Sequence, residues 1–369
     1  MTINALQQDI IYAEINLHAL QHNLTILKQH CPQSKLVAVI KANAYGHGML
    51  RLAQELQQNQ LVYALGVARL SEALRLRDAG IQLPIILLEG FFNKSDLSLL
   101  AQHNLQTIIH SQEQLQALLT SQLTKKLTVW LKFDTGMHRL GFHPEQIETA
   151  LSALNNASQV QQPVNLITHF SCADDISNPK TTQQIALFQR YAQHQPGLCS
   201  LASSPGILAW SEAHADVVRP GIAMYGVSPF SNQQGSDHHL QPVMTLKSRL
   251  IAVRTHTAGK SVGYSATWTA QQDTTLGVIA VGYGDGYPRT APAGTPVLIN
   301  GRIVPIVGRV SMDMITVDLG QHATDKVNDD VILWGEGLPV ETVAKHIGTI
   351  AYELVTKLTA RVSLIYHPS

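Results

Sequence analysis

The chain has 369 residues, a length that suits two ordinary domains or one large barrel with a smaller domain. Apolar residues make up 45% of the chain and charged residues 14%, so it can bury a sizeable core and is not a disordered protein. Lysine plus arginine and aspartate plus glutamate are equal at 26 each, and the absence of a basic cluster argues against nucleic-acid binding.

Strand-like and helix-like segments alternate over roughly the first 230 residues. The β-rich segments are 36–40, 62–67, 84–88, 106–109, 127–133, 164–170 and 198–203, and helix-like segments include 70–79, 112–120, 144–157 and 181–193. Such alternation predicts an α/β domain of parallel units, and seven or eight of them predict a closed (β/α)8 TIM-type barrel over residues 14–235. A doubly wound open sheet is the alternative, but no Gly-rich dinucleotide fingerprint follows the first strand.

From about residue 240 the pattern changes to short β-like segments separated by Gly, Asp and Asn turns. These segments are 246–256, 275–282, 296–300, 302–310, 314–319 and 331–335, followed by a helix over 340–358 and a last strand over 361–366. We therefore predict a mostly-β C-terminal domain over 240–369, with the polar loop 231–239 as the linker. Residues 1–13 are a candidate addition to this domain, because a strand there does not begin the barrel pattern cleanly.

Cysteine usage and the N-terminus indicate the compartment. Cys31, Cys172 and Cys199 are far apart and odd in number, which argues against a disulfide framework and fits a reducing environment. We find no secretory signal pattern and no apolar run near the roughly 20 residues needed to cross a bilayer. The prediction is a soluble cytoplasmic protein without membrane contact. No histidine pair has ligand spacing beside a third ligand, so no metal site is predicted.

The most informative segment is 37–48, VAVIKANAYGHG. An apolar strand runs directly into Lys41, which places the amine at the C-terminal mouth of a barrel, where the chemistry of this fold occurs. A partly buried lysine there can form a Schiff base. A lone strand-end lysine more often faces solvent, but the block KANAYGHG resembles the cofactor-lysine signature of alanine racemases.

The resemblance to the alanine racemase family extends over nearly the whole chain. Residues 132–141, KFDTGMHRLG, are similar to a second family block, although His138 stands where a glycine is usual. Further matching blocks follow in order at 168–170, 203–204, 218–222, 262–267, 281–289, 308–313 and 351–353. The resemblance implies a fold type III enzyme that uses pyridoxal 5′-phosphate to racemise L- and D-alanine, providing D-alanine for peptidoglycan.

A phosphate site can be read partly from the residues themselves. Ser204 offers a hydroxyl at a helix start, and the turn at Gly221 and Ile222 offers backbone amides, in the loops where this fold usually binds phosphate. An ordinary cap and turn would look the same. The resemblance adds Tyr45 and Tyr352 to the expected phosphate-binding residues.

By resemblance, Arg219 faces the pyridine nitrogen of the cofactor with His169 supporting it. A guanidinium does not readily give up a proton, so the ring nitrogen would stay unprotonated, which limits side reactions. The resemblance also implies that Lys132 carries a CO2-derived carbamate that orients Arg139 near the cofactor phenol and the substrate carboxylate. Without that modification the two cations would repel each other.

Inversion of a carbon centre needs a second proton-transfer group on the face opposite Lys41. The resemblance assigns this role to Tyr264, supplied by the partner subunit of a head-to-tail homodimer with shared active sites. Met312, as a substrate-binding residue, and Asp313 accompany it, and three further residues belong to the entryway: Asp174, Tyr283 and Arg289.

Three alternatives remain open. A broad-specificity racemase would be expected to carry an export signal, and an amino-acid decarboxylase of the same fold type would need different phosphate-loop motifs. A non-catalytic cofactor-carrying protein on the same barrel would end after the barrel, whereas this chain continues into the blocks at 262–267 and 308–313.

Overall fold

The computed structural model describes residues 10–193 and 195–368. The chain divides into two compact units. The first, which we call the barrel unit, is Gln21–Met224; the second, the C-terminal unit, runs from Tyr225 onward and includes the N-terminal residues up to Leu20.

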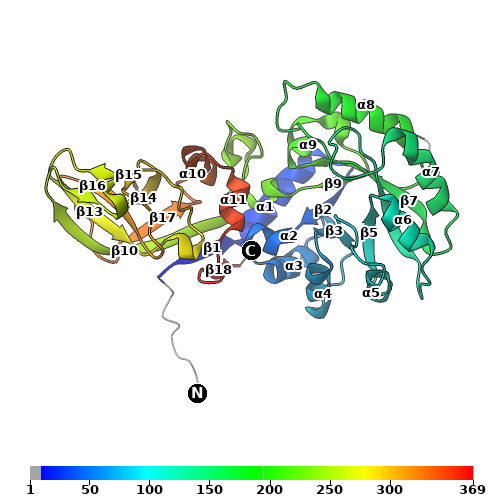
Figure 1. The fold of residues 1–369 in the computed structure, drawn as a ribbon, viewed down its shortest axis with the longest axis horizontal. Helices are drawn as coiled ribbons and strands as arrows, with labels where there is room; N and C mark the ends of the chain where they lie inside the picture. The colour runs from blue at the N-terminus through cyan, green and yellow to red at the C-terminus, as the bar shows by residue number, and fades with distance from the viewer. Residues whose placement is uncertain (1–9, 194, 369) are drawn as a thin grey trace, which may run out of the picture. The chain divides into compact units, whose positions relative to one another are not determined.

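The barrel unit is built from eight parallel strands that close on themselves (Figure 1). The strands are β2 (Lys35–Val39), β3 (Val62–Val67), β4 (Ile85–Leu87), β5 (Leu105–Ile109), β6 (Leu127–Lys132), β7 (Val160–Ile167), β8 (Cys199–Ser203) and β9 (Val217–Arg219). Closure is made where Lys35 and Leu36 of β2 pair with Val217 and Val218 of β9. The predicted (β/α)8 barrel is therefore confirmed, and the open-sheet alternative is wrong.

Helix α1 (Leu17–His30) precedes β2, and the other helices of this unit follow barrel strands along the chain (Figure 1). They are α2 (Lys41–Tyr45), α3 (Met49–Gln58), α4 (Leu70–Asp78), α5 (Asp96–Gln102), α6 (Gln112–Leu119), α7 (Pro144–Asn155), α8 (Lys180–Ala192) and α9 (Ser204–Ala209). In α3, the buried residues Met49, Leu52, Ala53 and Leu56 follow the three- and four-residue spacing of one helix face. Packing of this kind covers the outside of the barrel.

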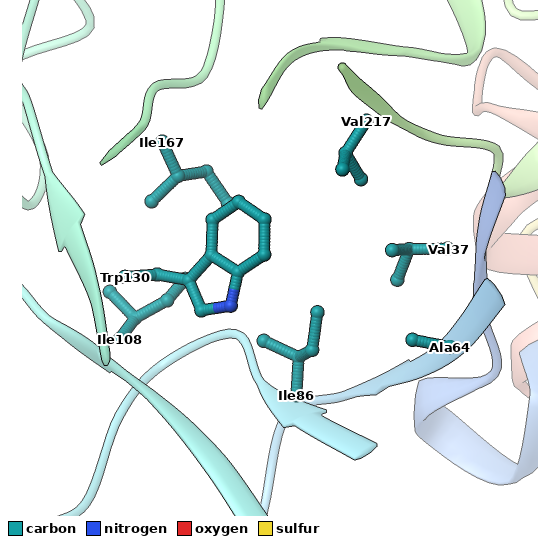
Figure 2. Close-up of a cluster of buried hydrophobic side chains, with 7 residues drawn as sticks. All are labelled: Val37, Ala64, Ile86, Ile108, Trp130, Ile167 and Val217. Carbon is teal, nitrogen blue, oxygen red and sulfur yellow. The ribbon is translucent and has the colours of Figure 1, made fainter. Parts of the chain in front are cut away.

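The barrel interior is filled with apolar side chains rather than left as a pore. Figure 2 shows seven of them converging from seven strands: Val37, Ala64, Ile86, Ile108, Trp130, Ile167 and Val217. Trp130 contributes the largest ring, and its Nε1 donates a hydrogen bond to Gln106 Oε1 at 2.8 Å. This packed layer holds the strand ends, and the loops after them, in place.

The C-terminal unit is an antiparallel β structure that also closes. Its strands are β1 (Tyr12–Asn16), β10 (Met244–His256), β11 (Ser261–Val262), β12 (Trp268–Thr269), β13 (Thr274–Ile279), β14 (Pro296–Ile299), β15 (Arg302–Val307), β16 (Ile315–Gly320), β17 (Asp330–Trp334) and β18 (Ser363–His367). The pairings run β13-β16-β15-β14-β17-β10 and return from β10 to β13. The predicted mostly-β character of this part of the chain is confirmed.

The N-terminal strand belongs to the C-terminal unit. β1 pairs with β10 in antiparallel fashion and with β18 in parallel fashion. Of the segment 1–13 suggested for this domain, positions 1–9 lie outside the described residues.

Two sequence predictions differ from the structure. The single helix expected over 340–358 is wrong: α10 (Val340–Ile347) ends at Gly348, whose φ of 81° is left-handed, and α11 (Ala351–Thr356) starts anew. A glycine at this position terminates a helix, because it adopts the left-handed conformation without a steric penalty. The expected linker is tied into the C-terminal unit, since the Gly235 amide donates to Glu341 Oε1 at 2.9 Å.

Within the described residues, we find no helix that combines the length and apolar character needed to span a membrane.

Candidate active site

Lys41 lies just beyond the C-terminal end of β2, at the start of an unusual turn. The four residues that follow it, 42–45, all have φ between 51° and 56°, so the backbone forms a left-handed turn without any glycine. Each such residue costs about 1–2 kcal/mol relative to right-handed backbone. Conformations of this kind persist only where their surroundings hold them, and they concentrate at functional sites.

Three side chains hold the Lys41 turn. Glu72 of α4 accepts the Ala42 amide on Oε1 at 2.8 Å, while its Oε2 accepts the amides of Ala68 and Arg69 at 2.9 and 3.0 Å. Asn43 Oδ1 accepts the Met49 amide at 2.9 Å.

The third side chain that holds the Lys41 turn is that of His47, which is fully buried. Its Nδ1 donates to the carbonyl oxygens of Ala44 and Tyr45 at 3.0 and 2.8 Å. Burial lowers the pKa of His47 to about 4, so its ring is neutral near pH 7. The backbone that carries Lys41 is thus fixed from both ends of the turn.

A second group of residues surrounds the start of α9. Ser204 Oγ accepts the Gly221 amide at 3.0 Å and the Ala223 amide at 3.2 Å. A Cβ added at Gly221 would lie 2.8 Å from Tyr45 Oη, so the missing side chain leaves room for that phenol. Burial raises the pKa of Tyr45 to about 12, which keeps its hydroxyl available as a hydrogen-bond donor. Ile222 is buried beside these groups.

Arg219 ends β9 with its guanidinium buried and bonded on several sides. It donates to Ser200 Oγ at 2.5 Å, and to the carbonyl oxygens of Thr168 at 2.7 Å and Leu201 at 3.1 Å. His169 Nδ1 lies 3.4 Å from the same guanidinium and can accept from it. Burial lowers the pKa of Arg219 to about 10, so the group remains charged near pH 7.

Lys132 ends β6 and adds positive charge to the same region. Burial, followed by repulsion from Arg219 and Arg139, lowers the pKa of Lys132 to about 8. The pKa of His169 is also well below its ordinary value, first through burial and then through the surrounding cations, which are Arg219, Lys132, Arg139 and Lys41. The barrel unit thus gathers several cations at one site.

This arrangement fits an anionic, phosphorylated cofactor. The Asp134 carboxylate partly offsets the three cations that act on Lys132. A bound anion would relieve this repulsion, and the hydroxyls of Ser204 and Tyr45, which both lie beside Gly221, suit a phosphate group.

The remaining predicted residues lie in other parts of the chain. Tyr264 and Met312 belong to the C-terminal unit, where their side chains are 70% and 53% exposed. The Tyr283 segment lies beside the Met312 segment, since the Gly284 amide donates to Met312 O at 2.8 Å. Arg361 pairs with both Asp285 and Asp313 at 3.0 and 2.8 Å.

Three more of the predicted residues are located by the segments that carry them: Tyr352, Arg289 and Asp174. Tyr352 is the second residue of α11 in the C-terminal unit, and Arg289 follows the Tyr283 segment there. Asp174 is exposed in the loop between β7 and α8 of the barrel unit.

Several supporting residues were not predicted from the sequence. Glu72 and Ser200 lie outside the motifs, and His47 lies within the block 37–48 but had no assigned role; their partners are distant in the chain or are backbone groups. The one available signal was the position of Glu72 in the first turn of a predicted helix, where a carboxylate commonly accepts backbone amides.

Comparison with known proteins identifies relatives of both units. Residues 15–229 match the family described as alanine racemase, N-terminal domain, and residues 243–366 match the alanine racemase, C-terminal domain. Alanine racemases from Aeromonas hydrophila and Vibrio cholerae are each 56% identical to this chain, over 96% of it and 98% of their own length.

Comparison with solved structures identifies the same family. The biosynthetic alanine racemase from Pseudomonas aeruginosa superposes with a TM-score of 0.94 at 42% identity, covering 98% of this chain and 100% of that one. Alanine racemase from Acinetobacter baumannii superposes with a TM-score of 0.90 at 36% identity, with the same coverage.

Proposed function

Because the chain belongs to the alanine racemase family, whose members depend on pyridoxal 5′-phosphate, we propose that it interconverts L- and D-alanine with Lys41 and Tyr264 as opposed acid–base groups. The observation that carries the proposal is the strained, multiply bonded turn that presents Lys41 beside a buried group of cations. When bound, the cofactor supplies an electron-withdrawing ring that stabilises the charge left on the substrate's α-carbon after proton loss.

We assign the cofactor-holding roles to side chains of the barrel unit and to Tyr352. Tyr45, Ser204 and the backbone at Gly221 and Ile222 would bind the phosphate together with Tyr352, and Lys41 would anchor the cofactor covalently. Arg219 would donate to the ring nitrogen while keeping its own proton, because its pKa of about 10 is far above neutral pH. Neutral His169 would accept from Arg219 and hold its orientation.

We assign the carbamate to Lys132. A pKa of about 8 leaves part of this amine unprotonated near neutral pH, and the free electron pair can attack CO2. The new N–C bond forms, one proton leaves the nitrogen, and a carbamate anion remains. That anion would lie among the cations that depress the pKa of Lys132, and it would orient Arg139 towards the substrate carboxylate and the cofactor phenol.

The two acid–base groups would act on opposite faces of the α-carbon. One base alone returns a proton to the face it came from, whereas two opposed bases invert the centre. We assign Lys41 to the D-enantiomer and Tyr264 to the L-enantiomer.

We propose a head-to-tail homodimer in which the partner subunit supplies Tyr264 and Met312. Both side chains are exposed in the single chain, although large apolar side chains of this kind are usually buried or placed in interfaces. The C-terminal unit would thereby complete the site on the partner. The proposed setting is the bacterial cytoplasm, where D-alanine would serve peptidoglycan synthesis.

The test uses D-alanine formation and cofactor labelling together. Borohydride reduction of the holoenzyme should fix the cofactor on the Lys41 peptide; labelling of another lysine would refute the assignment. Inactive Lys41→Ala and Tyr264→Phe variants should partly restore activity when mixed, because some heterodimers would contain one intact site. If verified subunit exchange leaves the mixture inactive, the shared-site proposal is wrong.

A further inference from the structure

We infer that Asp134, His138 and His143 form a binding site for a divalent transition metal of the zinc class, in the loop that follows β6. One ligand atom from each residue lies within 4.8 Å of the others. The sequence did not suggest this set, because the three residues lie in a loop, where a spacing of four or five positions does not predict that side chains meet as it can on a helix.

The loop is closed at its base, which brings its two ends together. Phe142 donates its amide to Lys132 O at 2.8 Å, and the Asp134 amide donates to Phe142 O at 2.9 Å. Asp134 at the start and His143 at the end of the loop therefore stay close. His143 directly precedes α7, and its amide donates to Gln146 Oε1 at 3.1 Å.

The Asp134 carboxylate is held in place before any ion binds. Its Oδ1 accepts three successive backbone amides, those of Gly136, Met137 and His138, each at 3.0 Å. The side chain is almost fully buried. Oδ2 is the oxygen that faces the imidazole, so a metal ion could bind Oδ2 while the three amide bonds stay intact.

His138 completes the set from the tip of the loop. Its φ of 55° is left-handed, which explains why glycine suits this position and why a histidine there carries a backbone cost. That conformation leaves Nδ1 3.7 Å from Asp134 Oδ2. Two ligands of a tetrahedral zinc ion lie about 3.3 Å apart, given bonds of about 2.0–2.1 Å, so small rotations of the exposed imidazoles would suffice.

The donor set defines the class of metal. Two imidazole nitrogens and one carboxylate oxygen suit Zn²⁺, Ni²⁺ or Cu²⁺ better than Ca²⁺ or Mg²⁺, which prefer oxygen ligands throughout. Three protein ligands leave a fourth position for water. Lys180 lies near the loop at Gly136, and Arg139 follows His138, so nearby cations should keep the affinity below that of a four-ligand structural site.

The test is metal binding to the chelator-treated holoenzyme, measured by zinc titration calorimetry and by the visible absorption of bound Co²⁺. We expect saturation near one ion per chain, and His138→Gly, which relieves the backbone cost, should weaken binding at least about tenfold. His143→Gln and Asp134→Asn should act likewise, the latter while keeping an acceptor for the three amides. His322→Gln, which changes an exposed histidine of the C-terminal unit, should leave binding unchanged.

Unchanged zinc affinity in His138→Gly, or the lack of a saturable site in the wild type, would overturn the inference. Loss of binding in His322→Gln would do the same, because it would place the ion elsewhere. Circular dichroism of each variant checks that the barrel is intact. Metal binding is measured directly, so failure of the proposed racemase activity would not be confused with failure of the metal site.

Discussion

Glu72→Gln should weaken the Lys41 turn without removing any group that touches the substrate. The two carboxylate oxygens of Glu72 accept hydrogen bonds from different backbone amides: Oε1 from Ala42, and Oε2 from Ala68 and Arg69. Glutamine has a single acceptor oxygen. With that oxygen on Ala68 and Arg69, its NH2 group faces the Ala42 amide, donor against donor.

The size of the expected effect on activity follows from the hydrogen bond that is lost between Glu72 and the Ala42 amide. A hydrogen bond to a charged acceptor contributes about 1.5–3 kcal/mol, and the half-buried position of Glu72 favours the lower end. The four left-handed residues each cost about 1–2 kcal/mol, so other backbone conformations of the turn become populated once the hydrogen bond to Glu72 is lost. A change of about 1.4 kcal/mol is tenfold in an equilibrium. We therefore expect kcat to fall about tenfold in both directions of racemisation.

The assay is a D-alanine coupled reaction together with its reverse, on protein of verified cofactor content. Glu341→Gln is the matched control, because Glu341 accepts both of its backbone amides, from Ser228 and Gly235, on one oxygen. Its kcat should be unchanged. If Glu72→Gln keeps wild-type kcat in both directions, the turn does not depend on this carboxylate and the reasoning is refuted.

Three further outcomes follow from burial and charge. Lys132 has a pKa of about 8 in the folded chain against an ordinary value of 10.5, so the unfolded chain binds this proton more tightly and the free energy of unfolding should rise between those pH values. Lys132→Met should abolish that rise, which is on the order of 3 kcal/mol. The measurement is urea unfolding of the cofactor-free protein in CO2-free buffer. Gly221→Ala should weaken pyridoxal phosphate binding at least about tenfold, measured by fluorescence titration, because the new methyl would meet Tyr45 Oη at 2.8 Å; unchanged affinity would contradict the assigned phosphate site. Trp130→Ala should lower the free energy of unfolding by about 3–5 kcal/mol, since it empties the centre of the barrel interior, and a loss below about 1 kcal/mol would show that the interior collapses to fill the space.

The sequence alone determined the class of each part of the chain. Hydrophobic runs such as β3 and β6 are buried on both faces, so they appear as short apolar segments between helices. The change of pattern near residue 240 reflects the antiparallel strands and their turns. The single helix expected over 340–358 failed because the apolar spacing continues across Gly348, whereas the backbone does not.

The sequence also located the residues that the family resemblance carries, since Lys41, Ser204 and Arg219 lie in contiguous blocks next to strand ends. What only the tertiary structure decided is how those groups are held and charged. The left-handed backbone after Lys41 depends on Glu72 from another helix, and the depressed pKa of Lys132 depends on Arg219 from another strand. Local propensity and spacing are properties of neighbouring residues, whereas burial and mutual repulsion arise only when the folded chain brings separate segments together. Within one loop, the backbone conformation that brings Asp134, His138 and His143 together is likewise not contained in their spacing.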